Sequence, residues 1–360
     1  MPKKSHDRKL IIIQAVAPDY RKFFFETLKK KLGDRFELYA GEQGFEKSIK
    51  TDSKIHKKLK NHYLFKRRFV FQTGIWHLLL RDDIIVMELN PRNFSTWIFL
   101  IIRKLFRKPT VLWGHAWPRK GKEAKSDVIR HLMRKSAGKI IVYTKQQQRE
   151  LQKKMPHKTV LSAPNAIYPR NLMGLPDNDR PEHLIYVGRL VESKKPFFLV
   201  KAFRQALDIL PSNVKLFLAG DGDEYAKIRD FIRRHRLENR VELLGHVNDY
   251  GRLRDLYGRS LFSVSPGYIG LSVTQSFGFG VPMLISKHEN HSPEIEAAIE
   301  GENALFFETG NTEDFIEKLK SIYANIDYWK HRRPKIVEFC RNNYSTETMA
   351  QTFINLLRYD

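Results

Sequence analysis

Two cations follow a short apolar run in the segment YVGRLVESKKP, residues 186–196. The run predicts a strand that ends at Val187, and Gly188 permits a turn before Arg189 and Lys194. A guanidinium grips phosphate oxygens through two parallel hydrogen bonds, and an ammonium adds a point charge. The spacing therefore predicts a phosphate site at the carboxyl end of a strand, with two solvated loop cations as the alternative interpretation.

Two glycine-ended strands could add backbone groups to such a site. The segment LAGDGDE places Gly220 and Gly222 directly after an apolar run, and GHV places a glycine before His246 and Val247. These turns leave backbone groups free to meet a base. Gly-Asp-Gly is also what a plain tight turn requires, and it is not the GxGxxG fingerprint of dinucleotide sites.

The segment SPGYIGLSVTQSFGFGVP, residues 265–282, carries no charge although the chain has a net charge of +24. It predicts a turn from Gly267 to Gly270, then Leu271 and a helix that begins at Ser272. Helix N-termini present unpaired N–H groups, so this turn and the two cations would suit one diphosphate. Glu294 stands at a further expected helix start, where the helix dipole alone also favours an acid.

The elements that position these groups follow one pattern in both halves of the chain. Short continuous apolar runs, typical of strands buried on both faces, alternate with helical stretches. The runs are LIIIQAVAP, ELYAGEQ, DDIIVMELN, PTVLWGHAW, KIIVYT and KTVLSAPN, then HLIYVGRL, VKLFLAGDGD, RVELLGHV, LFSVSP, VPMLIS and ALFFE. The helices are expected over 97–107, 127–137, 196–210, 224–236, 250–257, 293–300 and 326–343. We expect two doubly wound α/β domains, joined around 169–181.

Composition narrows the class of protein. A length of 360 residues allows two domains, and the single cysteine, Cys340, excludes an internal disulfide framework and favours a cytoplasmic setting. Residues 1–180 carry 40 Lys and Arg against 16 Asp and Glu, whereas residues 181–360 carry 24 of each. The first half should therefore attract an anionic partner, either nucleic acid or an anionic membrane surface.

Neither a signal peptide nor a membrane span is expected. The N-terminal apolar stretch is too short for a signal, and residues 260–286 hold four glycines, two prolines and six serines. The segment WIFLII, residues 97–102, is flanked by cations and predicts either a buried helix face or a membrane-surface helix.

The order of the motifs resembles that of retaining glycosyltransferases of the GT-B fold, family 4. The resembling segments are GRLVESKK, AGDGDE, LLGHV, SPGYIGLSVTQSFGFGVP and SPEIEAAIEGENALFF, which span nearly all of residues 183–310 in order. In the first half, APDYRKFFFETL resembles the opening strand and helix, VLWGHAWP the central histidine strand, and APNAIYP the interdomain connection.

The resemblance implies two Rossmann-like domains that face each other across a cleft. Residues 1–172 would take the acceptor, and residues 173–342 would hold a nucleotide sugar. Residues 343–360 would form a helix that returns to the first domain, with a plain terminal helix of the second domain as the alternative.

The resemblance also implies roles for individual residues. Arg189 and Lys194 would bind the diphosphate, and neither a metal nor another cofactor is implied, because protein cations neutralise the leaving group. His115 would act in catalysis by hydrogen bonding a sugar hydroxyl, unless it packs between its two neighbouring tryptophans, and Arg21 would lie on the acceptor side. The remaining donor-binding residues would be Gly220, Gly222, His246, Val247, Gly267, Gly270, Leu271, Ser272, Gln275 and Glu294.

The chain departs from the family pattern at one point. The family usually has two glutamates eight residues apart, and the alignment places Gly267 and Gln275 there. A glutamine oxygen can still accept a hydrogen bond from a ribose, whereas Gly267 offers only backbone. We expect an altered donor site rather than an inactive protein, since the leaving phosphate itself can take the acceptor proton in the mechanism that the resemblance implies.

These observations lead to one expected function and two alternatives. We expect transfer of a hexose-type sugar, with retention, to a lipid-linked or polysaccharide acceptor in bacterial surface glycan or lipopolysaccharide synthesis. The protein would be cytoplasmic and peripheral on the inner face of the membrane. The alternatives are a nucleotide-sugar-binding protein without catalysis and a basic nucleic-acid-binding protein. No nucleic-acid partner is expected, because the charge is spread over HKKLKNHYLFKRR, RKLFRK and PRKGKEAK without a recognised binding module.

Overall fold

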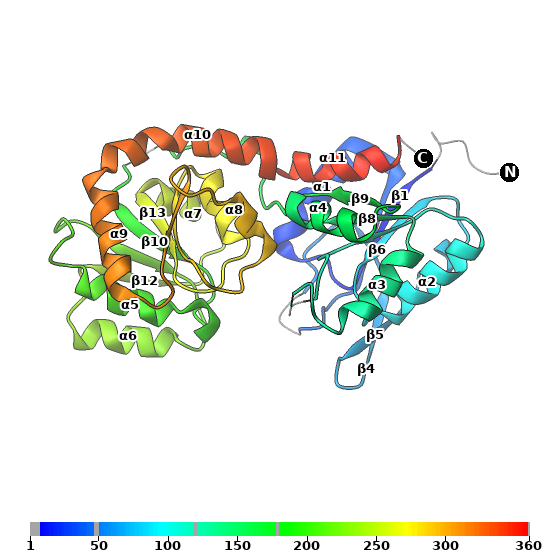
Figure 1. Cartoon of the computed structure of the whole chain (residues 1–360), viewed down its shortest axis with the longest axis horizontal. Coiled ribbons are helices and arrows are strands. Elements are labelled where there is room, and N and C mark those ends of the chain that lie inside the picture. The colour runs from blue at the N-terminus through cyan, green and yellow to red at the C-terminus, as the bar shows by residue number, and fades with distance from the viewer. Residues whose placement is uncertain (1–7, 47–49, 119–120, 178–179, 359–360) are drawn as a thin grey trace. The chain divides into compact units, whose positions relative to one another are not determined.

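The computed structural model describes residues 8–46, 50–118, 121–177 and 180–358 and contains two compact units (Figure 1). Unit 1 comprises Met1–Pro169 and Tyr344–Asp360, and unit 2 comprises Arg170–Asn343. Parts of four segments discussed above lie outside the described residues: 1–7 of the N-terminal segment, 119–120 of PRKGKEAK, 178–179 of the expected join and 359–360 of the expected C-terminal helix.

Unit 1 is built on a parallel sheet with the strand order β3-β2-β1-β6-β7-β8-β9. The strands are β1 Leu10–Gln14, β2 Phe36–Ala40, β3 His56–Lys58, β6 Ile84–Glu88, β7 Thr110–Trp113, β8 Lys139–Val142 and β9 Thr159–Ser162. Leu10 and Ile12 enter one hydrophobic core, and Ile11 and Ile13 enter the other. Strand β1 is an uninterrupted apolar run because both of its faces are buried.

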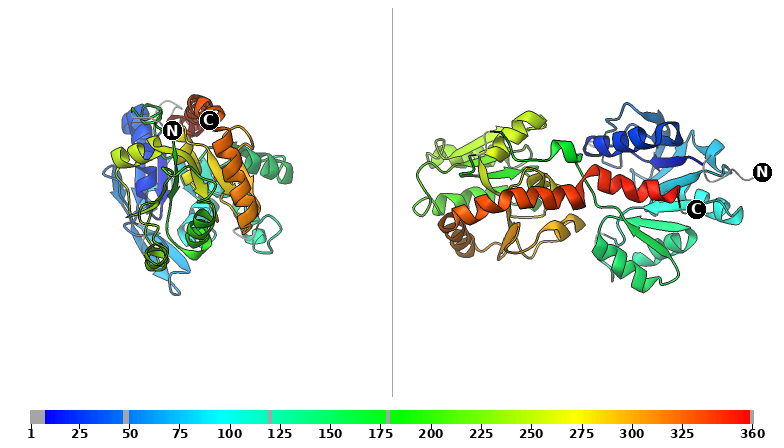
Figure 2. Two further views of the ribbon diagram at one scale, coloured as in Figure 1. Left: turned by 90° about the vertical axis from the view of Figure 1, so that its left-hand side faces the viewer. Right: turned by 90° about the horizontal axis from the view of Figure 1, so that it is seen from above.

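Helices cover both faces of this sheet. They are α1 Lys22–Leu32, α2 Phe94–Leu105, α3 Asp127–Ser136, α4 Lys145–Lys154 and α11 Thr346–Leu356. Helices α1 and α11 share one core, whereas α2, α3 and α4 share the other. The ring centroid of Phe353 lies 5.1 Å from that of Phe24 and 4.9 Å from that of Trp113, so the last helix packs against α1 (Figure 2).

Unit 2 is built on a second parallel sheet, in the order β12-β11-β10-β13-β14-β15. Its strands are β10 His183–Val187, β11 Leu216–Ala219, β12 Val241–Gly245, β13 Ser260–Ser265, β14 Met283–Ser286 and β15 Ala304–Phe307. Its helices are α5 Pro196–Gln205, α6 Tyr225–Arg234, α7 Tyr250–Gly258, α8 Ser272–Gly278, α9 Thr312–Ala324 and α10 Ile326–Tyr344. The expectation of two doubly wound α/β domains is confirmed, and the strand order reverses between β10 and β13.

Two elements differ from the sequence-based expectation. Residues 293–300 do not form an α-helix, because only Pro293–Ala297 turn, as a short 3-10 helix, before Ala298 becomes extended. The basic segment that begins at His56 contains strands β3 and β4 Lys60–Leu64, and β4 pairs with β5 Phe69–Thr73 in an antiparallel hairpin. Polar residues dominate β3 and β4, so their sequences lack the apolar run that predicted the other strands of the two parallel sheets, and β5 was not predicted either.

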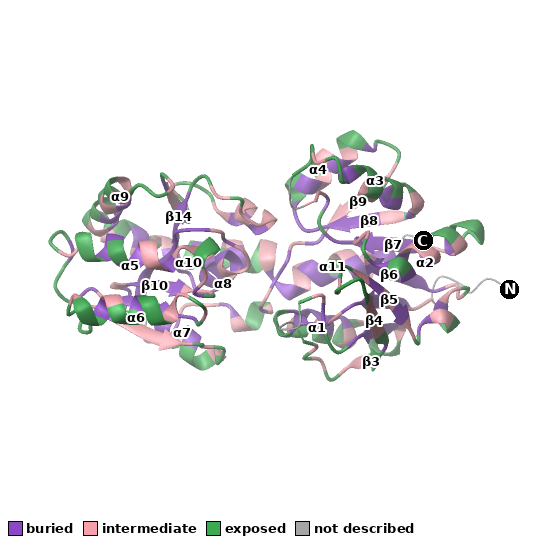
Figure 3. Ribbon diagram, turned by 90° about the horizontal axis from the view of Figure 1, so that it is seen from below, coloured by how far each residue is buried: buried purple, intermediate pink, exposed green. Residues whose placement is uncertain are grey.

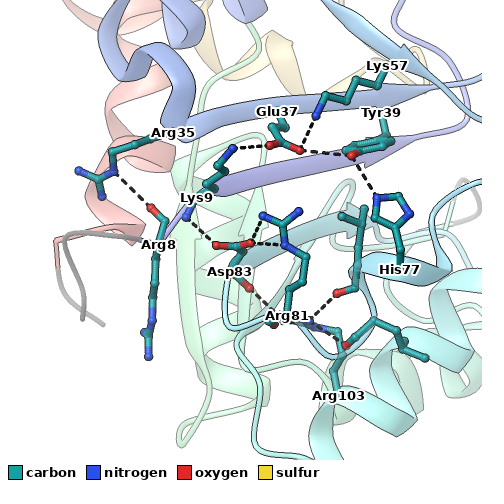
Figure 4. Close-up of polar contacts among 12 residues, drawn as sticks. Arg8, Lys9, Arg35, Glu37, Tyr39, Lys57, His77, Arg81, Asp83 and Arg103 are labelled. Carbon is teal, nitrogen blue, oxygen red and sulfur yellow. Dashed lines mark hydrogen bonds and ion pairs between the residues drawn. The ribbon is translucent and has the colours of Figure 1, made fainter. Parts of the chain in front are cut away.

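Arg103 corrects the interpretation of RKLFRK as a surface charge cluster, because its side chain is fully buried. Its guanidinium donates to the carbonyls of Leu79 (3.0 Å) and Asp83 (2.8 Å), among others, and to the hydroxyl of Thr110 (2.9 Å). Burial lowers the pKa of Arg103 to about 10. Figure 4 shows this group beside the ion pairs Lys9–Glu37, which joins the start of β1 to β2, and Arg81–Asp83, which lies in the segment before β6.

Candidate functional site

The candidate site in unit 2 lies where the strand order reverses. Strands β10 and β13 are neighbours in the sheet, but the connections that leave their carboxyl ends run to opposite sides, which is where open α/β sheets bind ligands. The loop after β10 carries Arg189 and Lys194, and the loop after β13 carries Gly267 and Gly270. The topology therefore brings the two cations and the uncharged turn to the same edge of one sheet.

Glycine allows these loops to approach one another. A β-carbon at Gly267 would lie 2.7 Å from the carbonyl oxygen of Ser193 and 2.7 Å from the carbonyl carbon of Lys194. The backbone N–H of Tyr268 donates to the Ser193 carbonyl at 3.0 Å. The turn after β13 is thus seated directly on the loop that carries Lys194, while Gly270 has only ordinary van der Waals neighbours.

Lys194 is half-buried, with its ammonium 4.5 Å from the centre of the Tyr268 ring. Burial, together with the nearby Arg189 cation, lowers its pKa to about 8, and the Glu294 carboxylate opposes the shift. Arg189 itself is exposed. The two cations repel each other as long as nothing negative lies between them, so an anionic ligand would relieve that repulsion.

The loop after β14 contacts both the loop after β10 and the loop after β13. His291 accepts the Ile269 N–H at Nδ1 (3.2 Å) and donates from Nε2 to the Ser286 carbonyl (2.7 Å). Burial lowers the pKa of His291, which agrees with this neutral tautomer. An ion pair of 2.5 Å joins Lys195 to Glu289. The sequence did not predict a role for three residues of these loops: His291, Tyr268 and Glu289. They connect loops to one another, and such contacts follow no motif spacing.

Gln275 and Glu294 sit behind this turn. Helix α8, which carries Gln275, has only seven residues, so its N-terminus adds little to the two cations. Gln275 is half-buried and accepts from the hydroxyl of Tyr257 at 3.5 Å, while Leu271 and Ser272 are also half-buried. Glu294 is 4% exposed and lies near enough to Lys194 to influence its pKa.

The remaining donor-side residues follow β11 and β12. A β-carbon at Gly220 would lie 1.8 Å from the carbonyl oxygen of Gly188, so this glycine serves close packing between loops. The N–H of Gly220 donates to the Gly245 carbonyl at 2.8 Å, and Gly222 lies against the backbone of Leu190. His246 is exposed and Val247 half-buried; both follow the edge strand β12, two strands away from β10.

In unit 1, Tyr143 brings His115 and Arg21 together. His115 is exposed, and its ring meets Tyr143 edge-on with centroids 4.7 Å apart, so it is not buried between tryptophans. Arg21 is buried, donates to the Tyr143 hydroxyl at 2.7 Å and lies 4.3 Å above the Trp113 ring. Glu88, which the sequence analysis did not single out, ends β6 nearby, accepts the Ala15 N–H (3.1 Å) and has its pKa raised by burial.

Across the described ranges, no cluster of three or more His, Cys, Asp or Glu side chains could hold a metal ion. Within the same ranges, none of the helices combines the length and the apolar character needed to cross a membrane.

The chain has two α/β units, each built on a parallel sheet, and a basic site at the carboxyl edge of the second sheet. This is the architecture of the GT-B class. The profile of the family described as "Glycosyl transferases group 1" matches residues 173–335. Among solved structures, HepE of Anabaena in complex with UDP and glucose is similar over 98% of this chain and 100% of its own, with a TM-score of 0.67 and 16% identity. The sucrose-phosphate synthase of Thermosynechococcus elongatus is similar over 98% of both chains, with a TM-score of 0.68 and 16% identity.

The match to the group 1 glycosyl transferases covers most of unit 2, and the similar solved structures share the two-unit GT-B fold of this chain. An uncharacterized glycosyltransferase of Methanocaldococcus jannaschii is 25% identical over 216 residues, covering 53% of each chain. The alignment thus spans about half the length of that curated relative.

Proposed function

We propose that the protein transfers a hexose-type sugar from a nucleotide sugar to a lipid-linked or polysaccharide acceptor, with retention of anomeric configuration, in bacterial surface glycan synthesis. The observation that carries this proposal is the packing of the turn at Gly267 and Tyr268 against Lys194, in the loop that also carries Arg189, at the strand-order reversal of unit 2. Since HepE binds UDP and glucose, a UDP sugar is the first donor to test.

In this proposal, the two cations stabilise the charge that grows on the diphosphate as the sugar leaves. Arg189 can bind two phosphate oxygens at once, and the half-buried Lys194 gains strength from its partly dry surroundings. The amide of Gln275 would meet the ribose, while Glu294 would orient the sugar or Lys194. Backbone groups around Gly220, Gly222, His246 and Val247 would line the base, and Gly270, Leu271 and Ser272 the phosphates and sugar.

The substitution at position 267 supports a changed sugar preference rather than a loss of activity. The space that a glutamate side chain would need is filled by the backbone of residues 193–194. Both cations and the glycine turn are present, and Gln275 at the second glutamate position retains an acceptor oxygen. A sugar bound here would therefore contact backbone groups where related enzymes offer a carboxylate.

The acceptor would meet unit 1, which carries the excess of positive charge. We place His115 next to the acceptor hydroxyl or the sugar, where the imidazole would hydrogen-bond and help shape the transition state. Arg21, fixed by Tyr143 and Trp113, would add positive potential behind it. A cytoplasmic protein with this charge would gather at the inner face of an anionic membrane, where lipid-linked acceptors reside.

The test is a panel of UDP, GDP and other nucleotide sugars, scored for stabilisation, hydrolysis and transfer. We expect one donor to be turned over, and Arg189→Ala to weaken the corresponding nucleoside diphosphate by about 1.5–3 kcal/mol, the worth of a charge-assisted contact. The matched control is Arg229→Ala, an exposed cation on α6. Unchanged affinity in Arg189→Ala would refute the site.

The two alternatives have distinct signatures in the same experiment. Binding of a nucleotide sugar without transfer or hydrolysis would identify a binding protein without catalysis. Salt-sensitive binding to duplex DNA, with no nucleotide-sugar turnover, would identify a nucleic-acid-binding protein.

A further inference from the structure

Helices α2 and α3 turn their outer sides away from the same face of the unit 1 sheet. Phe99 and Leu100 of α2 and Met133 of α3 enter the same core, and α2 packs against both α3 and β5. Their opposite sides are therefore open to solvent, and Figure 3 shows exposed positions on both helices. Several of the solvent-exposed side chains on these two helices are large and apolar, whereas the exposed side of a surface helix is usually polar.

Apolar side chains form a line along each helix. On α2, Phe94, Ile101 and Leu105 are spaced seven and four residues apart, which puts them on one side of an α-helix, and they are 37%, 61% and 77% exposed. On α3, Val128 and Leu132, four residues apart, are 66% and 54% exposed. Large apolar groups gathered at this exposure mark an interaction surface, whereas single ones are ordinary.

The hairpin β4–β5 extends this surface. Phe65 at its tip is 72% exposed, and its ring lies 6.1 Å from that of Phe69, which stacks on Phe94 at 5.0 Å. The tip residues Phe65, Lys66 and Arg67 all have positive φ (48°, 53° and 64°), a conformation that costs energy in non-glycine residues. We call the whole surface the apolar face; it consists of Leu64, Phe65, Phe94, Ile101, Leu105, Phe106, Val128, Ile129 and Leu132.

The charge around the apolar face is mainly positive, although Glu123, shortly before α3, is an exposed acid. Residues 60–73 and 91–108 contain no Asp or Glu. On α3, Asp127 is buried and paired with Arg134 and Lys154, so it does not offset the surface charge. The exposed cations on and beside the three elements include Lys60, Lys66, Arg68, Arg92, Lys104, Arg107, Lys122, Lys125 and Lys135.

Exposed apolar side chains surrounded by cations favour an anionic membrane surface over a second copy of the chain as the binding partner. A second copy of the chain would bring the same cations against these cations, which disfavours association. An anionic bilayer offers phosphates to the lysines and arginines and an acyl boundary to the apolar side chains, as amphipathic surface helices require.

We propose that the apolar face docks onto an anionic lipid bilayer, with Ile101, Leu105 and Val128 entering the headgroup–acyl boundary. The proposal deepens the proposed function, since it rests on the idea that the acceptor is lipid-linked, and it names the surface that would bring unit 1 to that acceptor. Docking itself is a property of unit 1 and can be measured without any sugar transfer.

The single cysteine makes a direct test possible. Cys340 is fully buried, so Leu105→Cys can be labelled selectively with a polarity-sensitive dye. With vesicles of phosphatidylcholine containing about one third phosphatidylglycerol, we expect a blue shift of the emission at position 105. Ile209→Cys, an exposed apolar position in unit 2, is the matched control and should give no shift, and vesicles of phosphatidylcholine alone should give little at either position.

A second measurement separates apolar docking from simple charge attraction. The pair Ile101→Ser and Leu105→Ser should weaken vesicle partitioning by at least about tenfold, because two exposed apolar groups no longer enter the bilayer. The control pair, Ile209→Ser and Ile299→Ser, should leave it unchanged. Equal partitioning of both pairs, complete release by raised salt alone, or a blue shift at position 105 that grows with protein concentration without vesicles would overturn the proposal.

UDP affinity is measured on the same samples. Loss of vesicle binding, with UDP affinity retained, is the expected result for the Ile101 and Leu105 serine pair and shows that unit 2 is intact. No vesicle binding by the unmodified protein, while it binds UDP, overturns the docking face and leaves the proposed function standing. Vesicle binding through this face without any nucleotide binding would support docking and count against the proposed function alone.

Discussion

Gly267 packs against the backbone of Lys194 so closely that a β-carbon at position 267 would lie 2.7 Å from the Lys194 carbonyl carbon. Side chains do not approach backbone atoms to that distance, and the backbone cannot swing aside as a flexible side chain can. The half-buried cation of the site and the turn that faces it therefore form one rigid arrangement. The absence of a glutamate at position 267 is therefore tied to the path of the backbone, because this close packing leaves no room for any side chain there.

We expect Gly267→Glu to impair the protein rather than restore a family-like site. Overpacking of this kind costs about 1–3 kcal/mol and would push the Lys194 loop away, so both the melting temperature and the affinity for nucleoside diphosphate should fall. Gly270→Ala is the matched control, because its nearest neighbours are at 3.9 Å. Higher turnover in Gly267→Glu, measured with the donor panel, would contradict this account.

Lys194 should make nucleotide binding depend on pH. Its pKa in the free protein is held at about 8, chiefly by burial, so the ammonium loses its proton as the pH rises through that value. A bound diphosphate favours the charged form, and affinity should therefore be full below pH 8 and decline above it. Calorimetric titration with UDP from pH 6.5 to 9.5 measures this decline. Lys194→Met should bind more weakly at pH 7 and lose the dependence; a decline that persists in Lys194→Met would assign it to another group.

The sequence allowed the fold and the cationic loop to be predicted for related reasons. Strands covered on both faces must be apolar throughout, and cations at a strand end have no structural reason to be spaced as Arg189 and Lys194 are. The hairpin strand β4 is not covered on both faces and need not be apolar, so it was not predicted. The segment that begins at Pro293 was predicted as a helix over 293–300, but it forms only a short 3-10 helix.

Loop–loop contacts were beyond the sequence for a different reason. The seat of Gly267 on Lys194, the His291 bridge and the Lys195–Glu289 pair join segments that are far apart along the chain. Nothing local to any of these segments encodes the partner. Burial of an arginine is equally hidden, since Arg103 lies in a segment where Lys104 and Arg107 are exposed.

Arg103→Ala should destabilise unit 1 strongly. Removing the guanidinium leaves several buried carbonyls without a donor, and the loss of such a group costs about 3–5 kcal/mol. Arg107→Ala, four residues along on the exposed surface, should change the free energy of unfolding by less than about 0.5 kcal/mol. Chemical denaturation measures both. A small effect of Arg103→Ala would mean that water replaces the lost donors.

His115 should affect transfer more than donor binding. It belongs to unit 1, where it is exposed and held edge-on against Tyr143, whereas Arg189 and Lys194, the proposed diphosphate ligands, belong to unit 2. Loss of one hydrogen bond made to the transition state typically costs about 10²–10³ in turnover, so His115→Ala should lower kcat by that order and leave UDP affinity within about twofold.

Two further variants test whether His115 itself is responsible for the loss of turnover. His115→Gln retains a hydrogen-bond donor and should recover part of the loss, whereas Tyr143→Phe keeps the ring that supports His115 and removes only the hydroxyl that receives Arg21. Tyr143→Phe should therefore have the smaller effect on kcat if His115 is the group that acts. Equal losses of turnover and of UDP affinity in His115→Ala would instead make His115 a structural residue, because a residue that acts only in the transition state leaves ground-state binding unchanged.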